Sequence, residues 1–149
     1  MLRLCNEDSG NQPWLDKLVF GSEESNVGAN GPVQSLHYSS SPEGVRLYNS
    51  AEAFRAAHAD GANPNRNFFT ADVLVDGKAR VVRFVNDPGG MHSEQRFVAW
   101  DQAMQERGRN VQVHRVYSER PPCGAFSANC ADTLGNRYGQ NLEVYHGNR

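Results

Sequence analysis

The sequence has few cysteines, no long apolar run and no leader pattern, and each absence excludes a class of protein. Its 149 residues include 3 cysteines, too few to suggest a disulfide framework in a chain of this size. No apolar run approaches the roughly 18 residues that a membrane span needs. The N-terminus also lacks the basic-then-apolar profile of a signal peptide. We therefore expect no membrane span, and a reducing environment fits the cysteine content best.

The sequence also has little net charge. Its 15 Lys and Arg residues nearly balance 17 Asp and Glu residues, which gives a formal net charge of -2. This excludes a protein whose whole surface grips nucleic acid, although a local basic patch remains possible. The arginines available for such a patch are Arg96, Arg107, Arg109, Arg115 and Arg120.

The amino-acid composition indicates one domain with many turns. The hydrophobic share is 38%, and 14 glycines and 7 prolines favour turns between short elements. We expect residues 1–149 to form a single domain, with an N-terminal elaboration over 1–65 and a core over 66–149.

The elaboration carries weak structural signals. Val33–Tyr38 predicts a short strand, and residues 39–44 predict a turn-rich link. Ser50 is then the expected N-cap of an alanine-rich helix over Ala51–Ala59.

The core alternates strands and helices. Phe68–Val75 and Lys78–Val85 are rich in Val and Phe and are joined by Asp76-Gly77, a strong signal for a β-hairpin. Apolar residues then recur at intervals of three and four, which predicts an amphipathic helix. The later elements are this helix over 92–107, a strand over Val111–Tyr117, a short helix over Cys130–Tyr138 and a strand over Leu142–Tyr145.

The order β-β-α-β-α-β favours an α/β fold with a mixed sheet and helices packed against it. The two helices would begin beyond the ends of strands, where open α/β sheets commonly place their sites. We expect the first 50 residues to cover the edge of this sheet.

A possible metal site is spread over the starts of these two helices. His92-Ser93-Glu94 begins the first helix, Pro122-Cys123 follows the next strand, and Cys130 begins the second helix. One His and two Cys are the donors of a three-ligand zinc site that leaves the fourth position open for water. The pattern H-x-E followed by P-C-x-x-C is typical of zinc-dependent nucleobase deaminases, although six residues here separate the cysteines.

The chemistry explains why Glu94 accompanies the three donors. Zinc lowers the pKa of a bound water from about 15.7 toward roughly 7, and a nearby carboxylate can then take the proton. We therefore predict His92, Cys123 and Cys130 as zinc ligands and Glu94 as the catalytic acid/base.

Each residue alone has a simpler interpretation. A lone His in a first helical turn is usually a polar residue near a loop, and two cysteines can be core thiols or a surface disulfide. A structural zinc site would need a fourth donor, for which His114 lies within a strand and Cys5 is distant in sequence. The conjunction of the motifs favours the catalytic interpretation.

These residues resemble the deaminase domains of bacterial polymorphic toxins, which are related to the APOBEC and tRNA-adenosine deaminases. The resemblance rests on His92-Ser93-Glu94, on residues 117–124 with Pro122-Cys123-Gly124, and on Asn129-Cys130. It covers about residues 68–145, and several toxin branches widen the interval between the cysteines in this way. The most similar type is the single-stranded DNA cytosine deaminase toxin.

The resemblance implies a cytidine deaminase-like three-layer α/β/α fold with the zinc site at the N-termini of two helices. It also implies a domain of a secreted bacterial effector that acts in the cytoplasm of the target cell. The implied partners are single-stranded DNA, with RNA possible, and a cognate immunity protein. We expect the domain to be a monomer.

Substrate contacts are expected on the segments beside the motif. A strand-binding enzyme holds an unpaired base against apolar or aromatic faces and the backbone with cations. Phe68 is also near the motif, but a core position in its strand is favoured. The predicted substrate-binding residues are Asn86, Tyr117, Ser118, Arg120 and Phe126.

Three functions remain open at this point. The first is deamination of cytosine in single-stranded DNA, or of RNA or double-stranded DNA. The second is deamination of free nucleosides or nucleotides. The third is a non-catalytic, zinc-stabilised interaction module, which has no use for Glu94.

Overall fold

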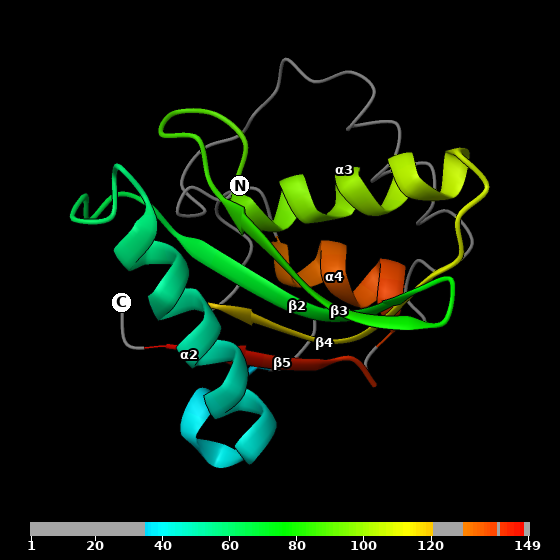
Figure 1. Ribbon diagram of the computed structural model, residues 1–149, viewed down its shortest axis with the longest axis horizontal. Helices are drawn as coiled ribbons and strands as arrows, with labels where there is room; N and C mark the ends of the chain where they lie inside the picture. The colour runs from blue at the N-terminus through cyan, green and yellow to red at the C-terminus, as the bar shows by residue number, and fades with distance from the viewer. Residues whose placement is uncertain (1–34, 121–129, 140, 148–149) are drawn as a thin grey trace.

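A five-stranded mixed sheet forms the centre of the protein (Figure 1). The computed structural model describes residues 35–120, 130–139 and 141–147. The strand order is β1-β5-β4-β2-β3. The strands are β1 (Ser35–His37), β2 (Phe68–Val75), β3 (Lys78–Val85), β4 (Val111–Ser118) and β5 (Glu143–His146).

Antiparallel and parallel pairings divide the sheet. β2 pairs antiparallel with both β3 and β4, whereas β5 pairs parallel with β4 and β1. The pairing of β1 with β5 confirms that residues before 50 cover this edge of the sheet. β3 and β4 both run antiparallel to β2. Their carboxyl ends therefore lie together where β2 begins, and below we call this side of the sheet, formed by the strand ends, the edge.

The predicted hairpin is confirmed at both of its strands. β2 and β3 span the predicted ranges, and the turn between them contains Asp76 and Gly77. Their φ angles of 53° and 82° are both positive. Two positive values are those of a type I′ turn, which Asp-Gly favours because Gly adopts a positive φ without steric cost.

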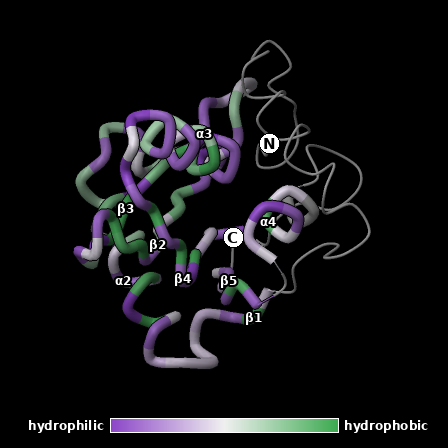
Figure 2. The backbone as a smooth tube through the Cα atoms, turned by 90° about the vertical axis from the view of Figure 1, so that its right-hand side faces the viewer, coloured by the Kyte–Doolittle hydropathy of each residue, from purple (hydrophilic) through white to green (hydrophobic). Residues whose placement is uncertain are grey.

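Helices cover both faces of the sheet, which confirms the mixed α/β fold. α2 (Pro42–Ala57) lies on one face, and α3 (Ser93–Glu106) and α4 (Cys130–Tyr138) lie on the other (Figure 2). A 3₁₀ turn, η1 (Tyr38–Ser40), precedes α2. The ranges of α3, α4 and β4 agree with the sequence within one residue at each end.

The two faces carry two separate cores, because successive residues of a strand point to opposite sides. Phe69, Ala71 and Val116 pack with Phe97 of α3 and Leu134 of α4. The smaller core, on the α2 side, contains Leu47, Ala51, Tyr117 and Tyr145.

The predicted start of α2 is wrong by nine residues. The helix begins at Pro42, and its N-cap is Ser41, whose hydroxyl accepts a hydrogen bond from the backbone N–H of Gly44 at 3.0 Å. Residues 39–44 are therefore not simply a link. Pro42 and Gly44 resemble turn residues in the sequence, but proline is favoured in the first helical turn because it needs no intrahelical N–H partner.

Within the part of the chain that the structure describes, no helix combines the length and the apolar composition that crossing a membrane would require.

We expect Gly44→Ala to destabilise the protein. In most helices this change stabilises by about 1 kcal/mol. Here the added Cβ would meet the carbonyl oxygen of Tyr38 and lie 2.9 Å from Cδ1 of Tyr145. Overpacking of this kind costs about 1–3 kcal/mol. Urea unfolding should show the loss, whereas Asn49→Ala, at an exposed position of the same helix, should be neutral or slightly stabilising. A Gly44→Ala variant as stable as the wild type would contradict the close approach of η1 and α2.

Candidate active site

The start of α3 places His92 and Glu94 in the interior of the protein. His92 is the N-cap of the helix, and its backbone N–H donates to the Gln95 side chain at 2.9 Å. His92 is 0% exposed and Glu94 is 1% exposed. Both residues of the predicted H-x-E motif are thus buried at the edge where β3 and β4 end.

Burial controls the protonation of Glu94. Removal from water raises the pKa of Glu94 to about 7, and hydrogen bonds from Ser93 and Ser118 act in the opposite direction. A carboxyl group with a pKa near neutral can take up a proton and release it again at physiological pH. Glu94 is therefore a candidate general acid/base.

Two serine hydroxyls from different elements contact the two carboxylate oxygens of Glu94. The Ser93 hydroxyl donates to Oε1 at 3.2 Å, and the Ser118 hydroxyl, at the end of β4, donates to Oε2 at 3.4 Å. Asn67 precedes β2, and its Nδ2 donates to both hydroxyls, at 2.6 Å to Ser93 and 2.9 Å to Ser118. One buried amide thus joins α3 and β4 around the carboxylate.

Asn86, predicted to meet a sugar or base edge, is buried in the frame of this site. Its Oδ1 accepts from the backbone N–H of Asn67 at 2.6 Å, and its Nδ2 donates to the carbonyl of Asn65 at 3.1 Å. Its exposed fraction is 1%. In this structure Asn86 therefore holds the segment before β2, and a contact with substrate stays a prediction.

A buried ion pair fixes the same segment from the α2 side. Arg55 donates to Glu119 through Nε at 2.9 Å and through Nη2 at 2.6 Å. It also donates to the carbonyls of Gly61 and Arg66. Glu119 in turn accepts from the backbone N–H of Phe68 at 3.0 Å. The pair therefore connects α2, the loop before β2 and the residue after β4.

The other predicted substrate residues are distributed unevenly. Ser118 contacts Glu94, as described above. The backbone N–H of Arg120 donates to Oδ1 of Asn67 at 3.1 Å, and its guanidinium group donates to the carbonyl of Pro64. Phe68 is a fully buried core residue, as the sequence favoured. Phe126 lies outside the described residues.

Tyr117 lies on the opposite face of the sheet from Glu94. It is 1% exposed and packs in the α2-side core with Leu47 and Tyr145. Burial raises the pKa of Tyr117 well above its usual value, so the phenol stays neutral. The structure does not bring Tyr117 together with the serine and glutamate side chains of the site.

The chemistry of the predicted ligands suits zinc, and the zinc site at this edge stays a prediction. Cys130 begins α4, which packs with α3 on one face of the sheet, and both helices follow strands whose carboxyl ends share an edge. Imidazole and thiolate are the donors zinc prefers, and His92 is fully buried there. Cys123 and the Cys130 side chain lie outside the described part. Among the described side chains alone, no group of three possible metal ligands comes together.

The sequence did not reveal the polar frame of the site. Asn67, Ser93 and the Arg55–Glu119 pair were not predicted as site residues. A signal for Asn67 does exist, since a polar residue directly before a buried strand falls at the edge where the H-x-E helix begins. Arg55 gives no such signal, because its partner Glu119 is 64 positions away.

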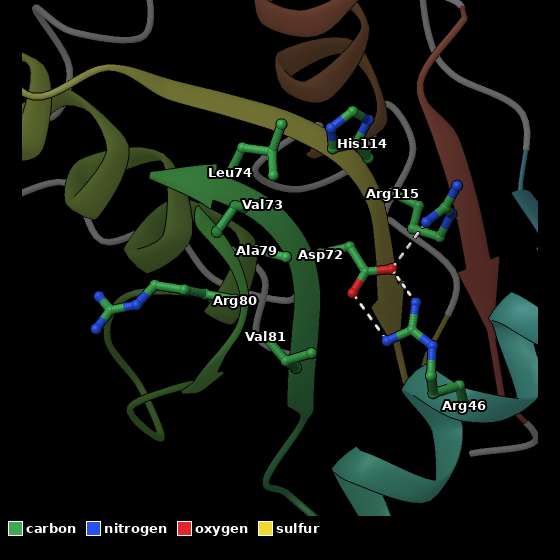
Figure 3. A pocket seen from close by; sticks show the side chains of 9 residues that line it. All are labelled: Arg46, Asp72, Val73, Leu74, Ala79, Arg80, Val81, His114 and Arg115. Carbon is green, nitrogen blue, oxygen red and sulfur yellow. Dashed lines mark hydrogen bonds and ion pairs between the residues drawn. The ribbon is translucent and has the colours of Figure 1, made fainter. Parts of the chain in front are cut away.

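A pocket of about 320 Å³ lies away from this site, on the α2 face of the sheet (Figure 3). In it, Asp72 lies between Arg46 and Arg115 and hydrogen-bonds to both. Arg46 also pairs with Glu43 at 2.6 Å, and Arg115 pairs with Glu143 at 3.1 Å. The positive and negative side chains are paired with one another. We therefore interpret this pocket as lined by a structural ion-pair network.

A comparison with protein families identifies residues 65–148 with the model described as Xanthomonas-like deaminase. This match covers more than half of the chain and includes His92, Glu94, Cys123 and Cys130. Searches of curated proteins and of solved structures gave no match.

We expect Glu119→Ala to be strongly destabilising. The change leaves the Arg55 guanidinium buried without its carboxylate, which costs about 3–5 kcal/mol. Urea unfolding of the variant should measure this loss. Glu143→Ala removes the carboxylate of a more exposed ion pair with Arg115 and should cost at most about 1 kcal/mol. If both variants lost the same free energy of unfolding, the buried Arg55–Glu119 pair would contribute no more to stability than the exposed pair.

We expect Asp72→Asn to cost about 1 kcal/mol, as for other partly exposed ion pairs. Partial burial opposes ionisation, but hydrogen bonds from Arg46 and Arg115 lower the pKa of Asp72 below 3.8. The stabilisation is therefore present above this value and is lost as the pH falls through the lowered pKa. Unfolding measured between pH 7 and pH 3 should show the wild type and the variant converging in acid. A stability difference that persists unchanged at pH 3 would argue against the ion pairs as its source.

Proposed function

Since the chain belongs to the Xanthomonas-like deaminase family, we propose that it is a zinc-dependent deaminase that converts cytosine to uracil in single-stranded DNA. The observation that supports this most strongly is Glu94, a buried carboxyl group two residues after a buried histidine, with a serine hydroxyl on each carboxylate oxygen. A purely structural module would bear the cost of burying this carboxyl group without using it.

His92, Cys123 and Cys130 would hold the zinc ion. When bound, the ion lowers the pKa of a coordinated water toward roughly 7. In the proposed reaction Glu94 takes a proton from the attacking water and delivers it to N3 of the base. It then transfers a proton to the departing amine at C4, so that cytosine and water give uracil and ammonia.

The serine hydroxyls would hold the Glu94 carboxylate in place during these transfers. Ser93 and Ser118 contact different carboxylate oxygens, so rotation of the carboxyl group would break both hydrogen bonds. Such preorganisation matters because a general base acts only within hydrogen-bond reach of the proton that it moves.

The charges around the site support a substrate that carries phosphate. Arg66 donates to the carbonyl of Asn86, Arg120 to that of Pro64, and Arg96 lies one helical turn after His92. Three guanidinium groups therefore lie on segments that frame Glu94. Arg66 is paired with Asp60 at 2.9 Å and Arg96 with Asp87 at 2.8 Å, so a phosphate would compete with these carboxylates. Cations in such positions bind the phosphates of a nucleic-acid strand and also that of a free nucleotide, whereas a free nucleoside carries no phosphate.

Aromatic surface next to the motif supports the same proposal. A pocket of about 380 Å³ opens beside Met91, the residue before His92, and is also lined by Phe84, Arg96 and Trp100. Aromatic side chains beside a cation form the kind of surface on which unpaired bases stack. We propose that bases flanking the target cytosine bind there.

The wider biological role belongs to the same proposal. We propose that the domain is the toxic part of a secreted bacterial effector, that it acts in the cytoplasm of the target cell, and that a cognate immunity protein neutralises it. These proposals rest on the resemblance of the H-x-E and Pro-Cys motifs to toxin deaminases.

The test uses a labelled single-stranded oligonucleotide with one cytosine, treated with the protein and then with uracil glycosylase and alkali. We expect cleavage of the single strand but not of its duplex. Glu94→Gln should abolish cleavage while keeping the fold and the zinc content, because it removes only the proton acceptor. Glu106→Gln, the same change at the far end of α3, should retain full activity.

Measuring the zinc content of variants tests the proposed zinc ligands independently of the proposed substrate. His92→Ala and Cys123→Ser should both lose stoichiometric zinc, and zinc retained in both variants would refute the proposed ligands. Uracil formed only in RNA, in duplex DNA or from free cytidine would replace single-stranded DNA as the substrate. No deamination of any of these by a zinc-loaded protein would refute the proposed function.

A further inference from the structure

We propose that Asn67 is a positioning residue that aims the hydroxyl groups of Ser93 and Ser118 at Glu94. This inference rests on the proposed function of Glu94 and adds to it a residue outside the H-x-E and Pro-Cys motifs. Asn67 is 1% exposed and directly precedes β2. In the contacts described here it acts on Glu94 only through the two serines.

The orientation of the Asn67 amide follows from its partner on the other side. The backbone N–H of Arg120, which can only donate, lies 3.1 Å from one end of the amide. That end must therefore be the oxygen Oδ1. The nitrogen Nδ2 then faces Ser93 Oγ at 2.6 Å and Ser118 Oγ at 2.9 Å, and its two N–H groups supply one hydrogen bond to each.

The amide in turn fixes the direction of both hydroxyls. A serine hydroxyl has one proton to donate and two lone pairs that accept. Because each Oγ accepts from Asn67, its own proton is available for the nearest acceptor. Those acceptors are Oε1 and Oε2 of Glu94, at 3.2 Å and 3.4 Å. Asn67 thus donates hydrogen bonds to the two serine hydroxyls, and each hydroxyl donates a hydrogen bond to the Glu94 carboxylate.

The position of Asn67 is itself secured by its backbone. Its N–H donates to the Asn86 side chain at 2.6 Å, and its carbonyl accepts from the backbone N–H of Asn86 at 3.3 Å. The backbone of Asn67 is therefore fixed by its link to Asn86. Its side-chain amide is held separately, by the backbone N–H of Arg120 at the oxygen and by the two serine hydroxyls at the nitrogen. A fixed donor of this kind keeps the catalytic carboxylate in one orientation during turnover.

The decisive variant is Asn67→Asp. Aspartate keeps the shape of the side chain and the oxygen that accepts from Arg120, but it replaces both N–H donors by an acceptor. The serine hydroxyls would then donate to the introduced carboxylate in preference to Glu94. We expect kcat to fall about tenfold to hundredfold, part of the contribution of a well-placed general acid/base. KM and zinc content should stay within about twofold, since Asn67 is not proposed to touch substrate or metal.

Asn63→Asp is the matched control. It places the same change four residues earlier in the same loop, where the side-chain oxygen accepts from the backbone N–H of Asn65 at 2.9 Å. Aspartate can still accept that hydrogen bond, and residue 63 does not contact the serines through any hydrogen bond described here. We expect this variant to match the wild type in kcat, KM and zinc content.

A background without the serine hydroxyls separates positioning from a merely structural role. In the Ser93→Ala/Ser118→Ala protein, Asn67→Asp should cause little further loss of kcat, because the hydroxyls through which it acts are gone. An equal loss in both backgrounds would overturn the proposal, as would an Asn67→Asp enzyme with wild-type kcat.

Failure of the proposed function would look different. A wild-type protein that deaminates none of the substrates would refute that function, and the positioning role would then be judged from crystal structures of the wild type and the Asn67→Asp variant. We expect both hydroxyls to leave Glu94 in the variant. Serine–glutamate contacts that persist there would overturn the role of Asn67 independently of activity.

Discussion

A carboxyl group that is removed from water must find hydrogen-bond donors, and this requirement organises the polar edge of the protein. Glu94 is 1% exposed, and its two oxygens receive hydroxyl groups from α3 and from the end of β4. An unpaired polar group in such a position costs several times the net gain of an ordinary hydrogen bond. Burial of the carboxylate therefore depends on the donors around Glu94, which Asn67 holds in place and Asn86 supports through the backbone of Asn67.

The sheet topology explains why these residues can meet. β2 runs antiparallel to both of its neighbours, so its first residue lies beside the last residues of β3 and β4. Asn67 before β2, Asn86 after β3 and Ser118 at the end of β4 are thereby adjacent in space although 51 positions separate Asn67 from Ser118. The helices that follow β3 and β4 begin at the same edge, which brings the start of α4 to the side of the sheet that holds His92.

The local pattern of the sequence predicted the core elements well because their determinants are local. The Asp76-Gly77 turn, the apolar period of α3 and the alternation in β4 all depend on residues close together in the chain. The beginning of α2 was missed because Pro42 and Gly44 are ambiguous without their tertiary context. Gly44 is needed in the helix only because Tyr38 and Tyr145 approach it, and Tyr145 is about a hundred positions away.

The sequence indicated His92 and Glu94 as site residues, whose roles stay predictions, but it did not reveal the framework around them. His92 and Glu94 follow from a short motif, whereas the roles of Asn67 and the Arg55–Glu119 pair depend on contacts across the sheet. The placement of Tyr117 shows the same limit. A shift of one residue along β4 moves a side chain to the opposite face, so Ser118 contacts Glu94 while Tyr117 packs under α2.

The two faces of the sheet contribute differently to stability and to the candidate site. The α2 face carries an aromatic core and ion pairs, and Arg55 of its helix pairs with Glu119 beside the site. The α3 face carries the residues that would act on substrate, but it also carries the larger apolar core, centred on Phe97 and Leu134. Buried polar groups at the edge are tolerable because apolar packing on both faces holds the strands in register. The frame of Glu94 thus has two tasks, because Asn67 and the serines hold the carboxylate while the Arg55–Glu119 pair also holds α2 against the sheet.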